Sequence, residues 1–293
     1  MGLRILLTNI ILTGRSGTEL YIRDLAAALL KRGHSPMVYT THPGPVADEI
    51  RAGGIPVVDD LSATEFQPEI IHGHHRYETA TALARFPGVP AVFFCHDARS
   101  SFDRAPLHPR IRRYAAVDQA CLERLLSDGV PEGKTVLILN FVNLERFKPR
   151  GPLPARPHRA LVFSNNASQA TFLPPIEEAC RQAGIQVEVA GMLSGNLLKQ
   201  PEDLLPLYDV VFAKARAAME AMAVGAAVIL CDNDGLGPMV TSADFSRLRL
   251  YNFGYRLLRE PCTAAGVRQH LESYDAGDAE RVRNLVRAEA GLD

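Results

Sequence analysis

The stretch DVVFAKARAAMEAMAVGAAVILCDNDGLGPMVT, residues 209–241, decides the fold. An apolar run over residues 210–212 is followed by a helix-favouring segment that ends at Gly225. A second apolar run over residues 227–230 then opens into a glycine-rich turn. This order predicts strand, helix, strand and loop. Glu220 is a lone acid inside the predicted helix, and it needs a polar partner because an unpaired buried carboxylate is costly.

The same alternation of apolar runs and helical patterns continues along the chain, and it is typical of parallel sheets flanked by helices. The strands predicted are residues 5–12, 36–42, 55–60, 69–75, 91–97, 136–141, 160–165, 185–191, 208–214 and 226–232. Helices are predicted over 17–32, 78–86 and 174–184. The segment DFSRLRLYNFGYRLLREP and the later YDAGDAERVRNLVRAEA also read as helical, with mixed charge.

A proline-rich and arginine-rich stretch, KPRGPLPARPHR over residues 148–159, separates two such alternating regions. Its composition differs from that of its neighbours and is typical of a linker. The sequence therefore predicts two domains, residues 1–153 and 154–293. Two domains of this size agree with the usual size of about 150 residues for one domain.

The amino-acid composition argues against several classes of protein. The chain is 47% hydrophobic and 22% charged, with a net charge of −1, so no general attraction to nucleic acid or anionic lipid is expected. The five cysteines are scattered without CxxC pairing, which favours a reducing cytoplasm. No apolar stretch approaches the ~20 residues of a membrane span, so we expect a soluble protein.

Two polar groups stand at predicted strand ends of the first domain. Gly14, Ser16 and Gly17 lie between the first strand and its helix, where backbone N–H groups bind an anion or simply close a tight turn. His72, His74 and His75 form the sequence HGHH. A zinc site that joins His74 to His96 is the alternative role, but no cysteine pair or HExxH helix accompanies it, and we expect no metal. A polar wall at the carboxyl ends of strands is the favoured role.

Four segments resemble the group-one, family-four retaining glycosyltransferases. RAAMEAMAVG resembles the segment whose glutamate binds the nucleotide ribose, here Glu220, against the alternative of an ordinary helix with a solvated Glu. GTELYIRDLAAALLKRGH resembles the opening segment, which implies that Gly17 faces the diphosphate. AVFFCHD places His96 toward the transferred sugar and Asp97 near the acceptor. FVNLERFKP resembles the border between the two domains.

The chain also departs from the family. Counting back from Glu220, the position of the usual first glutamate is Phe212, and SNNASQAT stands where the family has its basic pair. Lys214 and Arg216 are the expected replacements, since cations offset the charge of a leaving diphosphate. Arg216 precedes Glu220 by four residues, so the two pair across one helical turn, at the surface or within the site.

A glycine-rich turn in GLGPMVT corresponds to the family's turn beside the nucleotide and sugar. Gly235 and Gly237 are the residues expected to allow a close approach there. Towards the carboxyl terminus, from Ser242 onward, the resemblance becomes weaker.

The resemblance implies an α/β protein of the GT-B fold, with two Rossmann-like domains facing across a cleft. It implies a retaining glycosyltransferase that moves a sugar from a UDP-linked or GDP-linked donor to an acceptor hydroxyl, without a metal or other cofactor, in glycan or cell-envelope synthesis. The leaving phosphate would take the acceptor proton. An acceptor carried by a lipid would bring the protein to the inner membrane surface. The arginine-rich residues 99–113 are expected to form a solvated loop, with contact to an anionic acceptor or to a lipid carrier as the alternative. A sugar-nucleotide epimerase and a non-catalytic nucleotide-sugar-binding or scaffold protein are the rival interpretations.

Overall fold

The stretch over residues 209–241 folds largely as its pattern predicts. In the computed structural model, which describes residues 2–292, it forms β10 (Val210–Ala213), α7 (Ala215–Val224) and β11 (Ala227–Asp232). The expected loop after β11 is instead a strand, β12 (Gly235–Met239), which pairs antiparallel with β11. The prediction of a loop was wrong because a tight turn at residues 233–234 returns the chain directly onto the edge of β11.

The chain divides into two compact units, the first ending at Leu139 and the second running from Asn140 to Leu292. The sequence placed the boundary later, between residues 153 and 154. Residues after Asn140 pack with the second unit, since the N–H of Val142 donates to the carbonyl of Ala290 and the N–H of Arg150 donates to the carbonyl of Val224. Each unit is described below by itself.

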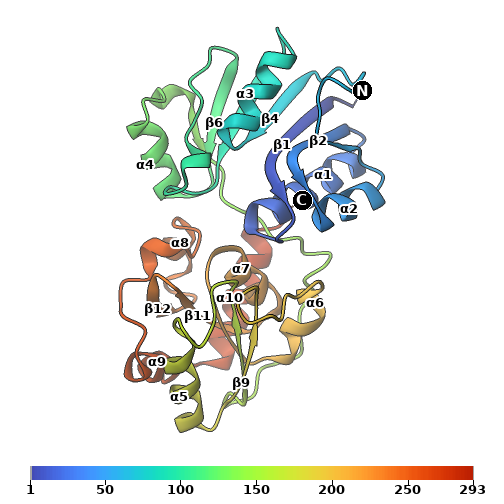
Figure 1. Cartoon of the computed structure of the whole chain (residues 1–293). Helices are drawn as coiled ribbons and strands as arrows, with labels where there is room; N and C mark the ends of the chain where they lie inside the picture. Colours follow the sequence, from blue (N-terminus) through green and yellow to red (C-terminus); the bar gives the residue numbers. More distant parts are fainter. Residues whose placement is uncertain (1, 293) are drawn as a thin grey trace. The chain divides into compact units, whose positions relative to one another are not determined.

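The first unit contains a parallel sheet of seven strands in the order β3-β2-β1-β4-β5-β6-β7. The strands are β1 (Arg4–Leu12), β2 (Ser35–Pro43), β3 (Val57–Val58), β4 (Ile70–His74), β5 (Ala91–Cys95), β6 (Ile111–Ala116) and β7 (Thr135–Leu137). The helices are α1 (Gly17–Lys31), α2 (Pro45–Ala52), α3 (Arg76–Arg85) and α4 (Gln119–Ser127), with short 3-10 turns η1 (Ser101–Asp103) and η2 (Glu132–Lys134). Figure 1 shows α1 and α2 beside β1 and β2, and α1 begins at Gly17, shortly after β1 ends at Leu12.

The sequence pattern missed three elements of the first unit, namely α2, β6 and α4. The strand β6 has the sequence IRRYAA, and its exposed Arg112 and Arg113 interrupt the apolar pattern around the buried Ile111 and Tyr114. The end of the segment 99–113, expected to be a loop, therefore belongs to the sheet. The helix α4 follows β6 and begins at the N-cap Asp118, whose side chain accepts from the N–H of Cys121.

The second unit has a five-stranded sheet in the order β12-β11-β10-β8-β9, parallel except for β12. Its further elements are β8 (Arg159–Phe163), β9 (Gln186–Ala190), α5 (Leu173–Ala183), α6 (Pro201–Leu204), η3 (Leu205–Leu207), α8 (Phe245–Arg249), η4 (Tyr255–Leu257), α9 (Ala264–Leu271) and α10 (Ala276–Glu289). None of the helices within residues 2–292 is long and apolar enough to cross a membrane.

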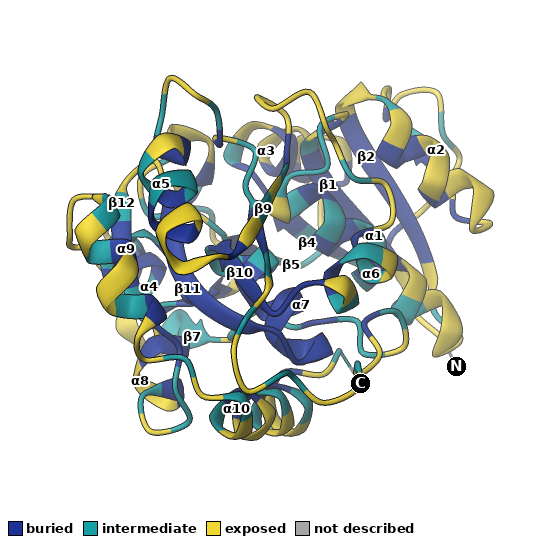
Figure 2. Cartoon of the chain, turned by 90° about the horizontal axis from the view of Figure 1, so that it is seen from below, coloured by how far each residue is buried: buried dark blue, intermediate teal, exposed yellow. Residues whose placement is uncertain are grey.

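Alternate residues of β10 and β11 face two different cores, as expected of a sheet covered on both sides. Val211 and Val228 pack with α7 and α10, whereas Phe212 and Ile229 pack with α5 and α9. Figure 2 shows β10, β11 and α7 as the buried centre of this unit. Phe212 is fully buried in β10, which confirms that the position of the family's first glutamate lies within the strand.

Candidate functional site

The carboxyl ends of parallel strands are where ligands of open α/β sheets bind. Six of the eight predicted site residues follow such strand ends, and Glu220 lies farther along the chain, in the middle of α7. Gly17, His96 and Asp97 belong to the first unit, and Lys214, Arg216, Glu220, Gly235 and Gly237 belong to the second. Gly237 lies within the antiparallel strand β12.

A polar cluster at the carboxyl edge of the second sheet centres on Lys214. This residue follows β10, and its Nζ lies 2.6 Å from Oδ2 of Asp232 and 3.2 Å from Oδ2 of Asp234. Asp232 is the last residue of β11 and is 1% exposed. Ser164 and Asn166, which follow β8, both donate to Asp232, Ser164 through Oγ at 2.7 Å. The cluster therefore ties the ends of three neighbouring strands together.

The charge of Lys214 is thus balanced by two carboxylates. Asp232 is fixed by further hydrogen bonds, whereas the side chain of Asp234 is 27% exposed and lies farther from Nζ. An anionic ligand can reach Lys214 most directly by taking the place of Asp234. Neither acid was singled out from the sequence, although the sequence CDND directly after an apolar strand is the signal that marks them.

Arg216 and Glu220 form an ion pair across one turn of α7, with Nε 2.7 Å from Oε1. The predicted pairing is confirmed. Both residues are buried, with Glu220 only 3% exposed, so the alternatives of a surface pair and of a solvated Glu are wrong. The surrounding Ala and Met side chains leave little water near the carboxylate, and a paired charge is the form in which such a group is tolerated. The role of Glu220 toward a ribose stays a prediction.

Gly235 and Gly237 allow a close approach, but the approaching group is the chain's own backbone. A Cβ built on Gly235 would lie 2.5 Å from the carbonyl oxygen of Glu260, and one on Gly237 would lie 2.7 Å from that of Leu257. Leu236, between them, pairs with Glu260 as an isolated bridge. These contacts explain both glycines through packing, and their contact with a nucleotide stays a prediction.

Three strand-to-helix turns hold a non-glycine residue in the left-handed region. They are Arg15 between β1 and α1, His75 between β4 and α3, and Ala215 at the start of α7, with φ values of 57°, 62° and 50°. Such residues are uncommon and carry a conformational cost, which tends to be found at functional sites. All three lie at the carboxyl edge of their sheet.

The glycine-rich turn of the first unit is organised by Glu19. Its carboxylate accepts hydrogen bonds from the backbone N–H groups of Gly14, Arg15 and Ser16, at 2.8, 3.2 and 3.1 Å. These N–H groups are therefore satisfied by an internal anion. Gly17, the first residue of α1, is exposed, and a Cβ built on it would meet nothing within 4 Å. The chain itself does not require glycine there, which leaves the surface of Gly17 open to a ligand.

The predicted polar wall of histidines is a hydrogen-bonded chain of three rings. Nδ1 of His72 lies 2.8 Å from Nε2 of His74, and Nδ1 of His74 lies 2.6 Å from Nε2 of His96. Phe94 stacks on His72 and Tyr21 meets His96 edge-on. Within residues 2–292, no group of three or more His, Cys, Asp or Glu side chains is placed to hold a metal ion.

Burial keeps these imidazoles neutral near pH 7. Loss of hydration lowers the pKa of His72 to about 4 and that of His96 to about 3. The same desolvation, with repulsion from the neighbouring rings, lowers the pKa of His74 well below its usual value. His75, whose Nδ1 accepts the N–H of Ile10, has its pKa lowered to about 4 by burial.

Asp97 and Asp103 organise the loop after β5. Oδ1 of Asp97 accepts from the N–H groups of Arg99 and Ser100, so part of this carboxylate closes a turn, while the residue itself is exposed. Asp103 is buried and accepts the backbone N–H of His96 at 2.7 Å. Burial raises the pKa of Asp103 to about 6. The predicted neighbours His96 and Asp97 thus differ, one half-buried in a histidine chain and the other at the surface.

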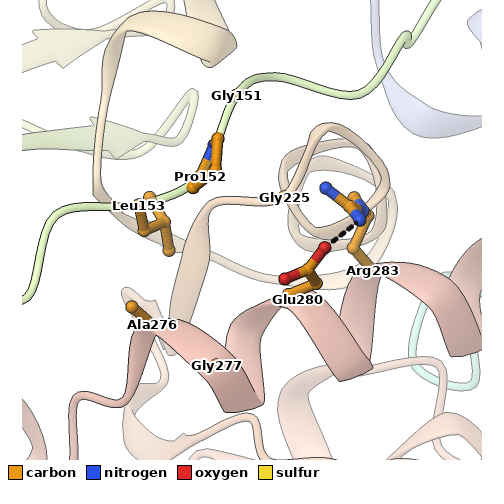
Figure 3. A pocket seen from close by; sticks show the side chains of 8 residues that line it. All are labelled: Gly151, Pro152, Leu153, Gly225, Ala276, Gly277, Glu280 and Arg283. Carbon is orange, nitrogen blue, oxygen red and sulfur yellow. Dashed lines mark hydrogen bonds and ion pairs between the residues drawn. The ribbon is translucent and has the colours of Figure 1, made fainter.

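A separate hollow in the second unit lies at the other end of its sheet. Gly151, Gly225, Ala276 and the ion-paired Glu280 and Arg283 are among its lining residues (Figure 3). Gly225 ends α7 and precedes β11, so the hollow is at the amino ends of the strands. Ligands of such sheets bind at the opposite edge, and none of the predicted site residues lines this hollow.

Comparison with known proteins agrees with this geometry. Residues 15–146 match the profile of Glycosyltransferase Family 4. The match covers most of the first unit and extends a few residues into the second. This match confirms the resemblance to the group-one, family-four glycosyltransferases, and it includes Gly17, His96 and Asp97. A search of curated protein sequences gave no match.

Solved structures extend the similarity over the whole chain at the level of fold. A glycosyltransferase from Rickettsia africae is 15% identical, with a TM-score of 0.68, and the match covers 99% of this chain and 95% of that one. HepE of Anabaena, solved with UDP and glucose, is 15% identical with a TM-score of 0.67, covering 99% and 96%. The lipopolysaccharide outer core galactosyltransferase WaaB is 11% identical with a TM-score of 0.55, covering 98% and 99%. The chain therefore has the GT-B fold, as the sequence predicted.

Proposed function

We propose that this protein is a retaining glycosyltransferase that transfers a sugar from a nucleoside diphosphate donor to an acceptor hydroxyl. The observation that carries the proposal is the arrangement around α7: Lys214 follows β10 as the N-cap of α7, and the buried Glu220 lies six residues later within that helix. Glu220 matches the position of the family's ribose-binding glutamate, and Lys214 replaces the family's basic pair, which this chain lacks. HepE, which shares the fold, was solved with UDP-glucose, and this supports UDP as the first nucleotide to test.

On the donor side, Glu220 binds the ribose hydroxyls and Lys214 binds the diphosphate. Donor binding then exchanges one anion for another at Lys214, with Asp234 moving away while Asp232 keeps the ammonium in place. The open face of Gly17 gives the diphosphate access to the first N–H groups of α1. Arg216 remains paired with Glu220 and orients its carboxylate.

On the acceptor side, His96 contacts the transferred sugar and Asp97 lies near the acceptor. Lys214 and backbone N–H groups offset the charge of the leaving diphosphate, and its phosphate oxygen takes the proton of the acceptor hydroxyl. The proposed reaction needs no metal and no further cofactor. A sugar or a lipid-linked acceptor fits a role in glycan or cell-envelope synthesis in the cytoplasm, at the inner membrane surface for a lipid carrier.

The first test is a thermal-shift screen of UDP-linked and GDP-linked sugars with the whole chain, because a ligand that binds the native state raises the midpoint. The best donor is then incubated with the protein alone, and released sugar is analysed by NMR. Slow hydrolysis with retention of the anomeric configuration is expected. Formation of an isomerised nucleotide sugar would instead identify an epimerase, and binding without turnover, with or without simple acceptors, would identify a non-catalytic binding protein.

A further inference from the structure

The histidines at the carboxyl edge of the first sheet form one continuous array. His72 and His74 lie two residues apart on β4, so their side chains project to the same face, and His96 follows the adjacent strand β5. Successive ring centroids are 4.8 Å apart, and the rings are stacked within 24° of parallel. The central ring, His74, is fully buried, whereas the outer two are half-buried.

Counting protons shows that this array has only two ordered states. A neutral imidazole carries one N–H, and each of the two hydrogen bonds needs one. If Nδ1 of His74 is protonated, it donates to His96, and Nε2 must accept from Nδ1–H of His72. If Nε2 of His74 is protonated, it donates to His72, and Nδ1 must accept from Nε2–H of His96. All three rings are therefore δ tautomers or all three are ε tautomers.

We propose that His72 and His74 are positioning residues that decide which nitrogen of His96 carries its proton. The inference rests on the proposed function, in which His96 meets the transferred sugar. In the δ state, Nδ1 of His96 offers an N–H to a sugar hydroxyl, and in the ε state it offers a lone pair. The burial that lowers the pKa of each ring supports the proposal, because it keeps a charged, disordered state from competing near pH 7.

Exchange between the two states is a balanced proton transfer. A proton added to Nδ1 of His96 releases Nε2–H to Nδ1 of His74, which releases its Nε2–H to Nδ1 of His72. His72 then loses the proton of its own Nε2. One proton enters, one leaves, and every ring is neutral before and after. Asp103, the acid of the adjacent turn η1, bonds the backbone N–H of His96 and lies 3.9 Å from His75, outside the three-ring array.

The first experiment needs no substrate. The full chain is labelled with ¹⁵N-histidine, and the ring nitrogens of His72, His74 and His96 are observed at pH 7.5 with and without the donor found by the thermal-shift screen. The same tautomer in all three rings is expected, with any switch on ligand binding shared by all of them. A mixed set of tautomers, or an imidazolium in any of the three, would overturn the proposal. This readout stands even if the protein transfers no sugar.

The second experiment removes the hydrogen bond between His72 and His74, at one end of the array. His72→Phe keeps an aromatic ring on Phe94 but removes the hydrogen bond, and His72→Asn restores an amide near the position of Nδ1. We expect His96 to become a mixture of tautomers in His72→Phe and to stay ordered in His72→Asn. Transfer should fall about tenfold in kcat in the first variant, with donor KM little changed, and recover in the second.

A matched control is His42→Asn, which replaces an exposed histidine of the same unit outside the array. It should leave both the His96 spectrum and kcat unchanged. If His72→Phe keeps a single His96 tautomer and wild-type kcat, His72 does not act through His96 and the proposal fails. A fall in kcat in both His72→Phe and His72→Asn, with the tautomer unchanged, would also reject it, since that pattern reports packing alone.

Discussion

The carboxyl edges of the two sheets both remove polar side chains from water, but they satisfy those side chains in different ways. In the first unit, buried polar rings are kept neutral and hydrogen-bonded to one another. In the second unit, acidic and basic side chains pair with one another, Lys214 with Asp232 and Arg216 with Glu220. The difference matches the proposed division of labour, because sugar hydroxyls need directed hydrogen bonds while a diphosphate needs cations.

The largest expected effect is a pH dependence of stability that the histidines give to the first unit. Above the unfolded histidine pKa of about 6.5, the buried rings are neutral in both states and add no pH dependence. Below it, histidines of the unfolded chain bind protons. Native His72 and His96 stay neutral down to pKa values of about 4 and about 3. The free energy of unfolding should therefore fall as pH falls, by up to about 1.4 kcal/mol per pH unit for each such histidine.

Hydrogen exchange at pH 7.5 and pH 5, corrected for intrinsic rates, measures this effect in each unit. Peptides of β4 and β5 should lose protection before those of β10 and β11. His72→Phe removes one titrating group and should make the dependence shallower by one proton. Equal protection of both units between pH 7.5 and pH 5 would contradict the expectation that the first unit is the more sensitive to pH.

Glu220→Ala is expected to have the next largest effect, and on stability as well as activity. It leaves the guanidinium of the buried Arg216 without its carboxylate, which costs about 3–5 kcal/mol. Glu220→Gln keeps an oxygen that accepts from Arg216 and should cost much less. Urea unfolding and donor binding distinguish the two: a folded Glu220→Gln that binds the nucleotide as tightly as wild type would exclude the ribose contact.

Lys214 is expected to matter more for donor binding than for folding. Lys214→Met removes one partner of Asp232, but Ser164 and Asn166 still donate to that carboxylate, so the cost should be about 1–3 kcal/mol. Donor affinity should fall at least tenfold, with partial recovery in Lys214→Arg. Asp234→Asn, which frees the ammonium from its more exposed partner, should bind the donor at least as well as wild type. Calorimetry with UDP measures all three, and unchanged affinity in Lys214→Met would remove Lys214 from the site.

Gly17→Ala is expected to give the smallest change in stability. The added methyl group meets no atom of the chain, and the loss of freedom in the unfolded state should stabilise the protein by about 0.4–1 kcal/mol. Donor KM should rise if the diphosphate approaches this residue. Gly73→Ala is the contrasting variant, because its Cβ would lie 2.5 Å from Oγ1 of Thr79 and should destabilise the first unit. An unchanged KM in Gly17→Ala would argue against the contact.

Much of the fold could be predicted from the sequence because buried parallel strands consist of runs of apolar residues. That signal located β10, β11 and the helix between them, and it failed for β6, where two exposed arginines interrupt the run. The pairing of Arg216 with Glu220 followed from helical spacing alone. Helical spacing cannot, however, report that both residues are buried.

The polar clusters were harder to predict, because they join residues from different strands. Asp232 and Ser164 meet only once β11 and β8 are placed on either side of β10. The alignment of His74 with His96 similarly depends on the register of β4 against β5. Sequence reasoning reached the correct strand ends, but the partners of each side chain required the sheet order.

Among the left-handed residues Arg15, His75 and Ala215, the last marks a position where a glycine should raise the thermal stability of this protein. Glycine adopts that conformation without steric penalty, so Ala215→Gly relieves the backbone strain of the native residue. It also loosens the bend that aims Lys214 and the start of α7. A gain in heat tolerance at this bend, obtained together with slower turnover, would show that the native residue was retained for its rigidity.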